Sequence, residues 1–126
     1  MPAETFSAAF GPTPAGVTRA RHFVRRQLEV NAELADTAEL LVAELAANVV
    51  RHARTDFEVK VVRSGANVRV IVEDGSAVEA VVRQMERDAP SGRGLRIVEA
   101  LADRWGSSPT ASGKQVWFEL ASDARP

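Results

Sequence analysis

Three polar residues recur at helical spacing near the middle of the chain. Glu44, Asn48 and His52 stand four residues apart in a segment rich in helix formers, so they share one edge of a helix. The amide oxygen of Asn48 can take one position on Mg²⁺ while water and phosphate oxygens fill the others. The carboxylate of Glu44, one turn earlier, could accept a proton from an attacking hydroxyl. On spacing alone, a solvated helix surface is the favoured interpretation.

Two later positions could bind parts of a nucleotide. Asp74 ends a strand-like segment and precedes Gly75. It is either an ordinary turn aspartate or an acceptor for an exocyclic amino group such as that of adenine. Gly92 and Gly94 stand at the start of an expected helix, where bare backbone N–H groups and the positive helix end suit phosphate. An ordinary loop-to-helix junction would carry the same glycines.

Composition removes several classes of function. The chain has 126 residues, 45% of them hydrophobic, which is enough for the core of one domain. Its net charge of -1 gives no electrostatic case for direct binding of nucleic acid or an anionic membrane. The absence of cysteine excludes thiolate catalysis and cysteine-based zinc sites, and His22 and His52 alone supply a zinc site poorly. Neither the G-x-S-x-G motif nor the G-x-x-x-x-G-K-[ST] motif is present.

The N-terminal residues lack the basic and apolar regions of a signal peptide. No apolar run approaches the roughly 20 residues of a membrane span. The expectation is a soluble, cytoplasmic protein without a membrane partner.

The first half of the chain predicts one strand and two helices. Alternating apolar residues predict a strand over 6–10 that stops at Gly11. Thr13 before Pro14 predicts a helix N-cap, with the helix reaching about residue 29. A second helix is expected from a capping box at Asp36 and Glu39 to about residue 53.

The second half predicts a hairpin, a third helix and a last strand. Apolar residues alternate over 57–61 and 68–72, separated by a four-residue loop at 64–67. Residues 76–91 are ambiguous between helix and loop. A third helix is expected from Gly94, with Gly106 as its C-cap residue, followed by a strand over 116–120 and a frayed tail at 122–126. These elements indicate a two-layer α/β (α+β) sandwich.

Taken in order along the chain, these groups resemble the GHKL ATPase superfamily, which includes gyrase-type topoisomerases and histidine kinases. The resemblance is closest to the anti-sigma-factor serine kinases and their small single-domain relatives. It rests on ELAANVVRHA at 44–53, GRGLRIV at 92–98 and EALADRWG at 99–106. It covers nearly the whole chain, from about residue 5 to 120.

The resemblance implies a single histidine-kinase-like ATPase domain over residues 1–126, with a Bergerat-type ATP fold of helices on a mostly antiparallel mixed sheet. It implies ATP and Mg²⁺ as cofactors, with Asn48 on Mg²⁺ and Asp74 on the adenine amino group. Glu44 would be the general base for a serine hydroxyl. The residues expected to contact the nucleotide are Asn48, His52, Asp74, Gly75, Gly92, Arg93, Gly94 and Leu95.

Two positions depart from the superfamily pattern. Asp74 is followed directly by Gly75, Ser76 and Ala77, where the fuller box reads Asp-x-Gly-x-Gly. Gln115 stands after the last glycine-containing turn, where close relatives often carry a threonine near the adenine. Both departures bear on nucleotide affinity.

The function expected from the resemblance is that of an ATP-binding anti-sigma regulatory factor. Its partners would be a sigma factor or an anti-sigma-factor antagonist, and it would phosphorylate a serine of the antagonist. One alternative is a non-catalytic, ATP-responsive module that only sequesters its partner. Another is a fragment of a histidine kinase, but 126 residues leave no room for the phosphoacceptor helix pair in this chain. The resemblance also implies a homodimer.

Overall fold

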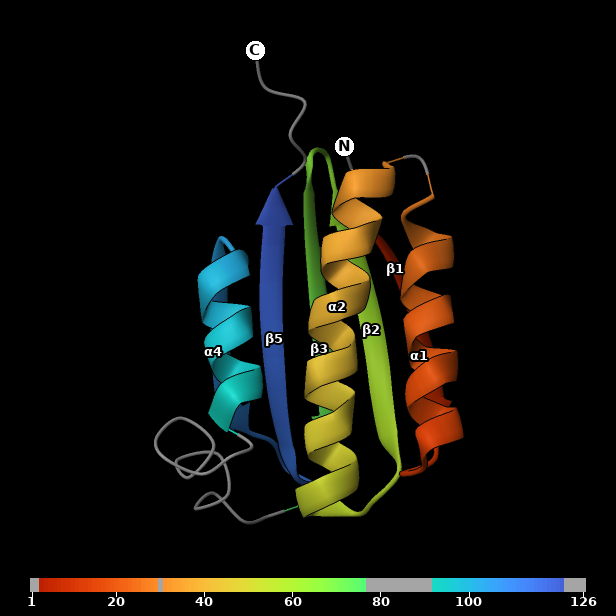
Figure 1. Ribbon diagram of the computed structural model, residues 1–126, viewed down its shortest axis with the longest axis vertical. Coiled ribbons are helices and arrows are strands. Elements are labelled where there is room, and N and C mark those ends of the chain that lie inside the picture. The colour runs from red at the N-terminus through yellow and green to blue at the C-terminus, as the bar shows by residue number, and fades with distance from the viewer. Residues whose placement is uncertain (1–2, 30, 77–91, 122–126) are drawn as a thin grey trace.

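The computed structural model describes residues 3–29, 31–76 and 92–121, and of 92–95 it describes the backbone. Helices cover one face of a five-stranded sheet (Figure 1). The elements in chain order are β1 (Glu4–Phe10), α1 (Pro14–Gln27), α2 (Ala32–Asn48), the π-helical turn η1 (Val49–Ala53), β2 (Phe57–Ser64), β3 (Asn67–Asp74), α4 (Gly92–Leu101), β4 (Arg104–Pro109) and β5 (Lys114–Ala121). The predicted two-layer α/β sandwich is confirmed.

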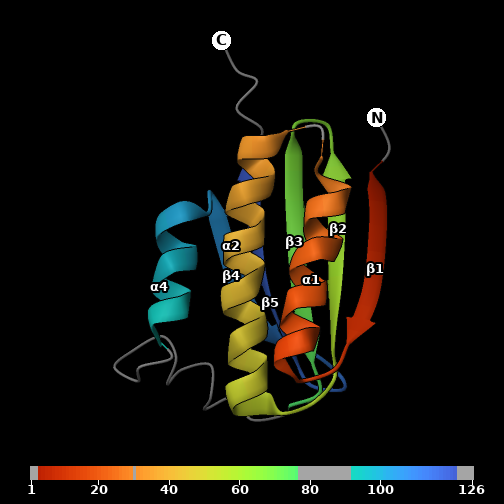
Figure 2. The ribbon, with the colours of Figure 1, turned by 45° about the vertical axis from the view of Figure 1, so that its right-hand side comes forward.

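The strand order is β1-β2-β3-β5-β4, and every pairing among these strands is antiparallel. β5 therefore lies between β3 and β4, so the last strand is an interior strand of the sheet. β1 forms one edge, as the turned view shows most clearly (Figure 2). This order places the end of β3 directly beside the start of β5.

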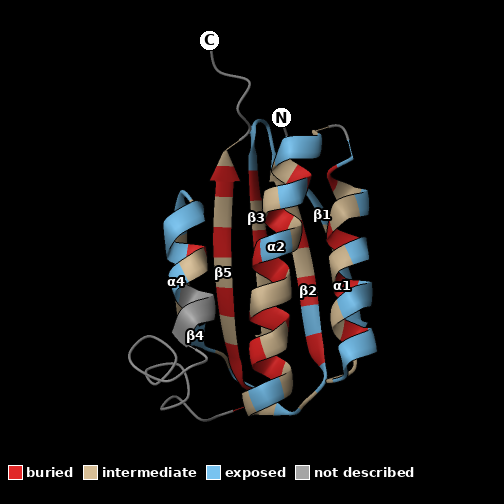
Figure 3. Ribbon diagram, in the orientation of Figure 1, coloured by how far each residue is buried: buried red, intermediate tan, exposed pale blue. Residues whose placement is uncertain are grey.

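The core lies between the helices and the face of the sheet that they cover, which is where the buried positions fall (Figure 3). Alternation along the strands supplies the sheet side of this core, because residues two apart point to the same face. The buried strand residues are Phe57, Val59, Val61, Val68, Val70, Val72, Val116, Phe118 and Leu120. The helices contribute Ala20, Phe23, Val24, Ala35, Ala38, Leu41, Val42, Leu45, Ala46 and Val98.

The first predicted helix start is confirmed and the second is wrong. The Thr13 hydroxyl accepts the Gly16 N–H at 3.0 Å, with Pro14 as the first helical residue. For α2 the N-cap is Asn31, whose side-chain oxygen accepts the Leu34 N–H at 3.0 Å. The helix therefore begins one turn before the expected capping box at residues 36 and 39.

Asp36 and Glu39 bind arginines of α1 instead of capping α2. The Glu39 carboxylate accepts hydrogen bonds from Arg21 at 3.0 Å and from Arg25 at 2.6 Å. Arg25 also pairs with Asp36. The carboxylates of α2 therefore pair with two arginines of α1 and not with backbone N–H groups of their own helix. These ion pairs link α1 to α2.

The second helix continues to residue 53, as expected, but its last turn is widened. Arg54 donates its N–H to the carbonyl of Val49 at 2.8 Å, five residues back, and itself adopts a left-handed conformation with φ of 56°. A π turn changes the angular step per residue. His52 is therefore rotated away from the line through Glu44 and Asn48 that regular helical spacing predicts.

The hairpin turn is tighter than predicted. β2 and β3 pair as far as Ser64 and Asn67, which leaves Gly65 and Ala66 as a two-residue turn. Gly65 has a φ of 61°, a conformation that glycine adopts without steric cost.

Gly106 is not a helix C-cap. α4 ends at Leu101, and Gly106 lies inside β4, opposite Trp117 of β5. A Cβ at Gly106 would come within 2.8 Å of the Trp117 ring, so the glycine makes room for an aromatic neighbour. The sequence analysis missed β4 for this reason. Most of the ambiguous segment, 77–91, and the tail at 122–126 lie outside the described residues.

Candidate nucleotide-binding site

The sequence-predicted residues gather at one end of the sandwich. α2 ends there at Asn48 and β3 ends there at Asp74, while β5 starts there at Lys114 and α4 at Gly92 (Figure 1). Antiparallel strands and the helices between them alternate in direction, which brings these four termini to one end.

Asp74 is a buried carboxylate, with the residue only 5% exposed. Its Oδ1 accepts the backbone N–H of Ser76 at 2.8 Å, and its Oδ2 is paired with the ammonium of Lys114. Gly75 follows it, exposed, and donates its N–H to the Thr55 hydroxyl at 2.9 Å. Asp74 is therefore more than a solvated turn residue, although the Ser76 contact is of the kind that turn aspartates make.

Lys114 faces Asp74 because the two are directly opposite in the β3–β5 register. Both side chains are buried, at 7% and 3% exposure. The preceding glycine permits this arrangement, since a Cβ at Gly113 would lie 1.9 Å from the carbonyl oxygen of Asp74. The backbone of the β5 start thus approaches the end of β3 more closely than any residue with a side chain would allow.

Sequence reasoning missed Lys114, although a signal was present. Lys114 has the same parity as Val116 and Phe118, so it had to share their buried face. Gln115 has the opposite parity, and its side-chain amide donates to Ser108 on the neighbouring strand at 3.3 Å. The residue of this turn that lies beside Asp74 is therefore Lys114, and Gln115 points to the other face of the sheet.

Asn48 is buried to 4% exposure at the end of α2. Its Oδ1 accepts a hydrogen bond from the Arg51 guanidinium at 3.0 Å. Its Nδ2 is buried without a hydrogen-bond partner among the described residues. An unpaired buried donor costs free energy, so this amide group suits a ligand that brings an acceptor.

One small cavity joins these residues. Asn48, Asp74 and Lys114 line it together with the apolar side chains of Leu45, Val49, Val72 and Val116. Its volume is about 10 Å³, which is close to the least that a single water needs. Its lining is part polar and part apolar, and in this arrangement it is too small for a nucleotide base.

His52 is half-buried on the π turn, and its Nε2 has no hydrogen-bond partner in the part of the chain that the structure describes. Burial, together with the positive charges of Arg51, Lys114 and Arg54, lowers the pKa of His52 below its usual 6.5. The imidazole is therefore neutral at pH 7, and it can act as a hydrogen-bond donor or acceptor there but not as a cation.

Glu44 is half-buried one turn before Asn48, as predicted. It makes no hydrogen bond or ion pair with the described residues, in contrast to Asp36 and Glu39 on the same helix.

Gly92, Arg93, Gly94 and Leu95 form the first turn of α4, which begins two residues earlier than predicted. The first four N–H groups of a helix lack intrahelical acceptors, so this turn offers donors to an anion.

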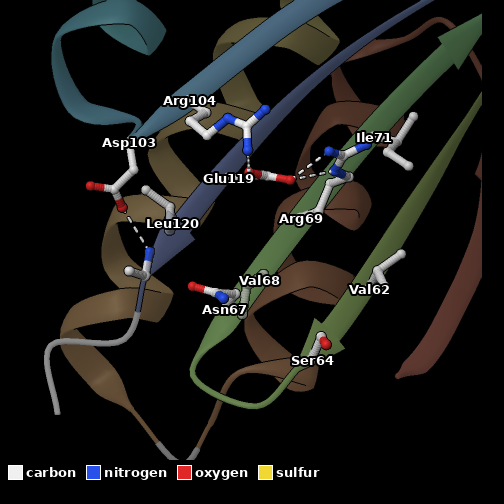
Figure 4. A pocket seen from close by; sticks show the side chains of 11 residues that line it. Val62, Ser64, Asn67, Val68, Arg69, Ile71, Asp103, Arg104, Glu119 and Leu120 are labelled. Atoms are coloured by element: carbon white, nitrogen blue, oxygen red, sulfur yellow. Dashed lines mark hydrogen bonds and ion pairs between the residues drawn. The ribbon is translucent and has the colours of Figure 1, made fainter. Parts of the chain in front are cut away.

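A larger hollow of about 650 Å³ lies on the face of the sheet that the helices leave open. Its charged groups have partners: Arg69 and Arg104 both reach the carboxylate of Glu119, and Asp103 accepts the Ala121 N–H at 2.7 Å (Figure 4). Arg69 also stacks over the Trp117 ring at 4.2 Å. This hollow contains none of the sequence-predicted site residues.

A family model described as the histidine kinase-like ATPase domain matches residues 10–120. The match spans most of the chain, and the protein belongs to this family. Membership makes it an ATP-binding domain with a regulatory type of role. No curated protein matches the chain at a significant level. Among the described helices, none is both long enough and apolar enough to span a bilayer.

The donor set matches an adenine nucleotide in chemistry, because a buried carboxylate at Asp74 and a buried Asn48 N–H without a partner among the described residues line one cavity. The volume of that cavity is that of a water and not of a base. The described residues contain no cluster of three or more histidine, cysteine or acidic side chains that would hold a metal by itself. A magnesium ion would need most of its oxygen ligands from water and phosphate.

Proposed function

We propose that this domain binds ATP with Mg²⁺ and acts as a serine protein kinase on an anti-sigma-factor antagonist. The observation that carries the ATP-binding part is that two buried polar residues, Asn48 and Asp74, line one small cavity together with Lys114 and apolar side chains. A buried polar group without a partner calls for an explanation, and a ligand that supplies the partner is one.

Each residue has a role in this proposal. Asp74 would accept from the amino group of adenine, and Asn48 would hold the metal through its amide oxygen. The N–H groups of the first turn of α4 would bind phosphate oxygens. The bound nucleotide supplies the transferable phosphoryl group, with ADP as the leaving group.

Glu44 would serve as the general base in the transfer. As the serine oxygen forms its bond to phosphorus and the bond to the leaving phosphate oxygen breaks, the hydroxyl proton passes to the Glu44 carboxylate. Its position one helical turn from Asn48 keeps the base close to the metal ligand.

One observation favours a second candidate function. Catalytic bases are commonly oriented by a further group, and Glu44 has no such partner among the described residues. A non-catalytic module that sequesters a sigma factor or another regulator, and releases it in response to ATP, uses the same nucleotide site without a base.

Incubation with radiolabelled ATP, Mg²⁺ and partner proteins encoded beside this chain tests both candidates. Label on a serine of a partner supports the kinase. Nucleotide-dependent capture of a partner without label supports the sequestering module. Calorimetry that finds no binding of ATP at millimolar concentration would contradict both.

A further inference from the structure

β1 forms one edge of the sheet, and no described strand pairs with its outer side (Figure 2). It pairs with β2 in an unbroken register from Glu4 to Phe10, so neither a bulge nor a proline interrupts it. Proteins commonly protect an edge strand with such features or with charged side chains, and Glu4 is the only charged residue of β1. This edge therefore keeps the ability to accept a further strand.

The backbone groups that face outward belong to Thr5, Ser7 and Ala9. Ser64 and Asn67 close the two-residue turn between β2 and β3, and such a turn joins two residues that exchange backbone hydrogen bonds. The direction of these bonds alternates along a strand, so β1 bonds to β2 through its even-numbered residues. Its odd-numbered residues direct their N–H and C=O groups to the open side, and their side chains are exposed.

α1 packs beside β1 and turns two different sides to its neighbours. The Phe23 ring of α1 contacts the Phe10 ring of β1, with 5.9 Å between the ring centroids. Arg21 and Arg25 bind the Glu39 carboxylate of α2. A helix turns by about 100° per residue, which places both arginines about 160° from Phe23. One side of α1 therefore faces β1, and the opposite side faces α2.

Two arginines on the β1 side of α1 make no ion pair with the described residues. Arg19 and Arg26 stand four residues before and three residues after Phe23, so they project within about 60° of its direction. Both are exposed, whereas the charges of Arg21 and Arg25 are offset by acidic residues of α2. Unbalanced positive charge therefore lies beside the open edge of β1.

The charge of these arginines selects the occupant of the edge. If β1 paired with β1 of a second copy, the two α1 helices would bring Arg19 and Arg26 of both copies together, and like charges repel. An extended segment with carboxylates on its helix-facing side would instead be attracted to both arginines. Side chains of a strand alternate between its faces, so these carboxylates would stand at every second position.

We propose that the outer edge of β1 binds an extended acidic segment of a partner protein as an additional antiparallel strand, with carboxylates at alternate positions facing Arg19 and Arg26. The outward backbone groups of β1 would supply the hydrogen bonds, and the arginines would select the sequence. The antiparallel direction is that of every pairing in the described sheet. β2 separates this edge from β3 and Asp74, so the proposal does not depend on the binding of ATP.

A labelled peptide of about nine residues, in which glutamate and valine alternate, is the probe, because it can span the seven residues of β1. We expect fluorescence anisotropy at low salt to show that the chain binds it roughly 10-fold more tightly than a peptide of the same composition with glutamates and valines in separate blocks. The block peptide has the same charge, but it cannot direct all its carboxylates to α1 while it pairs along β1.

Methylation of the peptide backbone tests strand addition without altering the protein. In the antiparallel pairing the valines lie opposite the outward-facing residues of β1 and exchange hydrogen bonds with them, while the N–H groups of the glutamates point away. N-methylation of the valines should lower the affinity by at least about 10-fold, because several backbone hydrogen bonds are lost. N-methylation of the glutamates should change it by less than about threefold.

Variants assign the selection to α1. Arg19→Gln combined with Arg26→Gln should weaken binding of the alternating peptide roughly 3- to 30-fold, the range for two lost exposed ion pairs. The matched control combines Lys60→Gln with Arg104→Gln, which removes the same charge from the face of the sheet that the helices leave open. The control should stay within about twofold of the wild type. Melting curves establish that each variant is folded.

Three outcomes would each overturn the proposal. Equal affinity for the alternating and block peptides would mean that charge alone attracts them. Unchanged binding after N-methylation of the valines would mean that no strand is added to β1. A wild-type dimer in sedimentation equilibrium, with the outward amides of β1 protected from hydrogen exchange, would assign the edge to a second copy of the chain.

Discussion

Glu44 decides between an enzyme and a binding module. Glu44→Gln keeps the shape of the side chain and removes most of its basicity. We expect serine phosphorylation to fall by roughly 10²- to 10⁴-fold at saturating ATP, while ATP affinity stays within twofold, because a positioned base contributes about that factor. Phosphotransfer kinetics beside calorimetry measure both quantities.

The matched control for this change is Glu33→Gln, an exposed glutamate in the first turn of the same helix. It should leave phosphotransfer unchanged. Unchanged transfer in Glu44→Gln as well would end the general-base role.

The Asp74–Lys114 pair predicts a strong energetic coupling. Either Asp74→Asn or Lys114→Met leaves one buried charge uncompensated and should lower the free energy of unfolding by about 3 kcal/mol. The double variant removes both charges and should recover to within about 1 kcal/mol of the wild type. Urea unfolding of the four proteins without nucleotide measures the cycle, and additive losses would show that the side chains do not interact.

The sequence predicted part of this site. Residue type and position singled out Asn48 and Asp74, and the resemblance to the GHKL superfamily assigned them to a nucleotide; both residues are buried at one end of the sheet. Lys114 was missed because its importance depends on which strand β5 pairs with, and strand order is a long-range property that local alternation does not encode. The phosphate-binding role of Gly92 and Gly94 stays a prediction.

At the scale of single elements, Asn31 is the residue that starts α2. Asn31→Ala removes the acceptor for the Leu34 N–H and should cost about 0.5–2 kcal/mol of the free energy of unfolding. Chemical denaturation measures the loss. Thr13→Ala, the corresponding change at α1, should cost a similar amount, and a silent Asn31→Ala would mean that α2 needs no side-chain cap.

The contact between α1 and α2 should depend on pH through Glu39. Hydrogen bonding to Arg25 is the main reason that the pKa of Glu39 lies below its ordinary 4.5. A carboxyl group whose pKa is lowered on folding stabilises the folded state above its ordinary pKa and loses that contribution as pH falls.

Glu39→Gln should therefore be less stable than the wild type at pH 7, and the difference should shrink as pH falls below about 4.5. Urea unfolding at a series of pH values tests this. Glu58→Gln, an exposed glutamate on β2, serves as the control that should show no such trend. A difference that persists undiminished at pH 3 would contradict the ion-pair explanation.

Hydrophobic periodicity and capping residues predicted most of the helices and strands, but they misplaced several of the residues at which these elements begin or end. The start of α2 was misplaced because Asp36 and Glu39 satisfy a capping pattern in sequence but are taken by arginines of α1 in the fold. β4 was missed because a glycine after a helical pattern is typical of a helix C-cap. Gly106 is instead a strand residue, where the absence of a Cβ leaves space for the ring of Trp117 on the adjacent strand. Both errors come from partners that lie far away in the sequence.

At the scale of the whole molecule, nucleotide state should control partner binding. If the terminal phosphate orders residues around the start of α4, then ATP and ADP will change the affinity for a partner to different degrees. Calorimetric titration of the partner into the apo, ADP-bound and ATP-bound chain measures the three affinities. Equal values would leave a scaffold that does not respond to nucleotide.

The interior position of β5 has a consequence for synthesis. β1, α1, α2, β2 and β3 can emerge from the ribosome and begin to pack before β5 exists, but β3 then has an open edge where β5 will lie. Lys114 reaches Asp74 only when this strand inserts, after closure of a loop of 40 positions, and such long-range pairings form slowly. A nascent chain that stops short of β5 therefore carries Asn48 and Asp74 without the cation that pairs with Asp74. We therefore expect a nascent chain to lack the complete cavity until β5 has paired with β3.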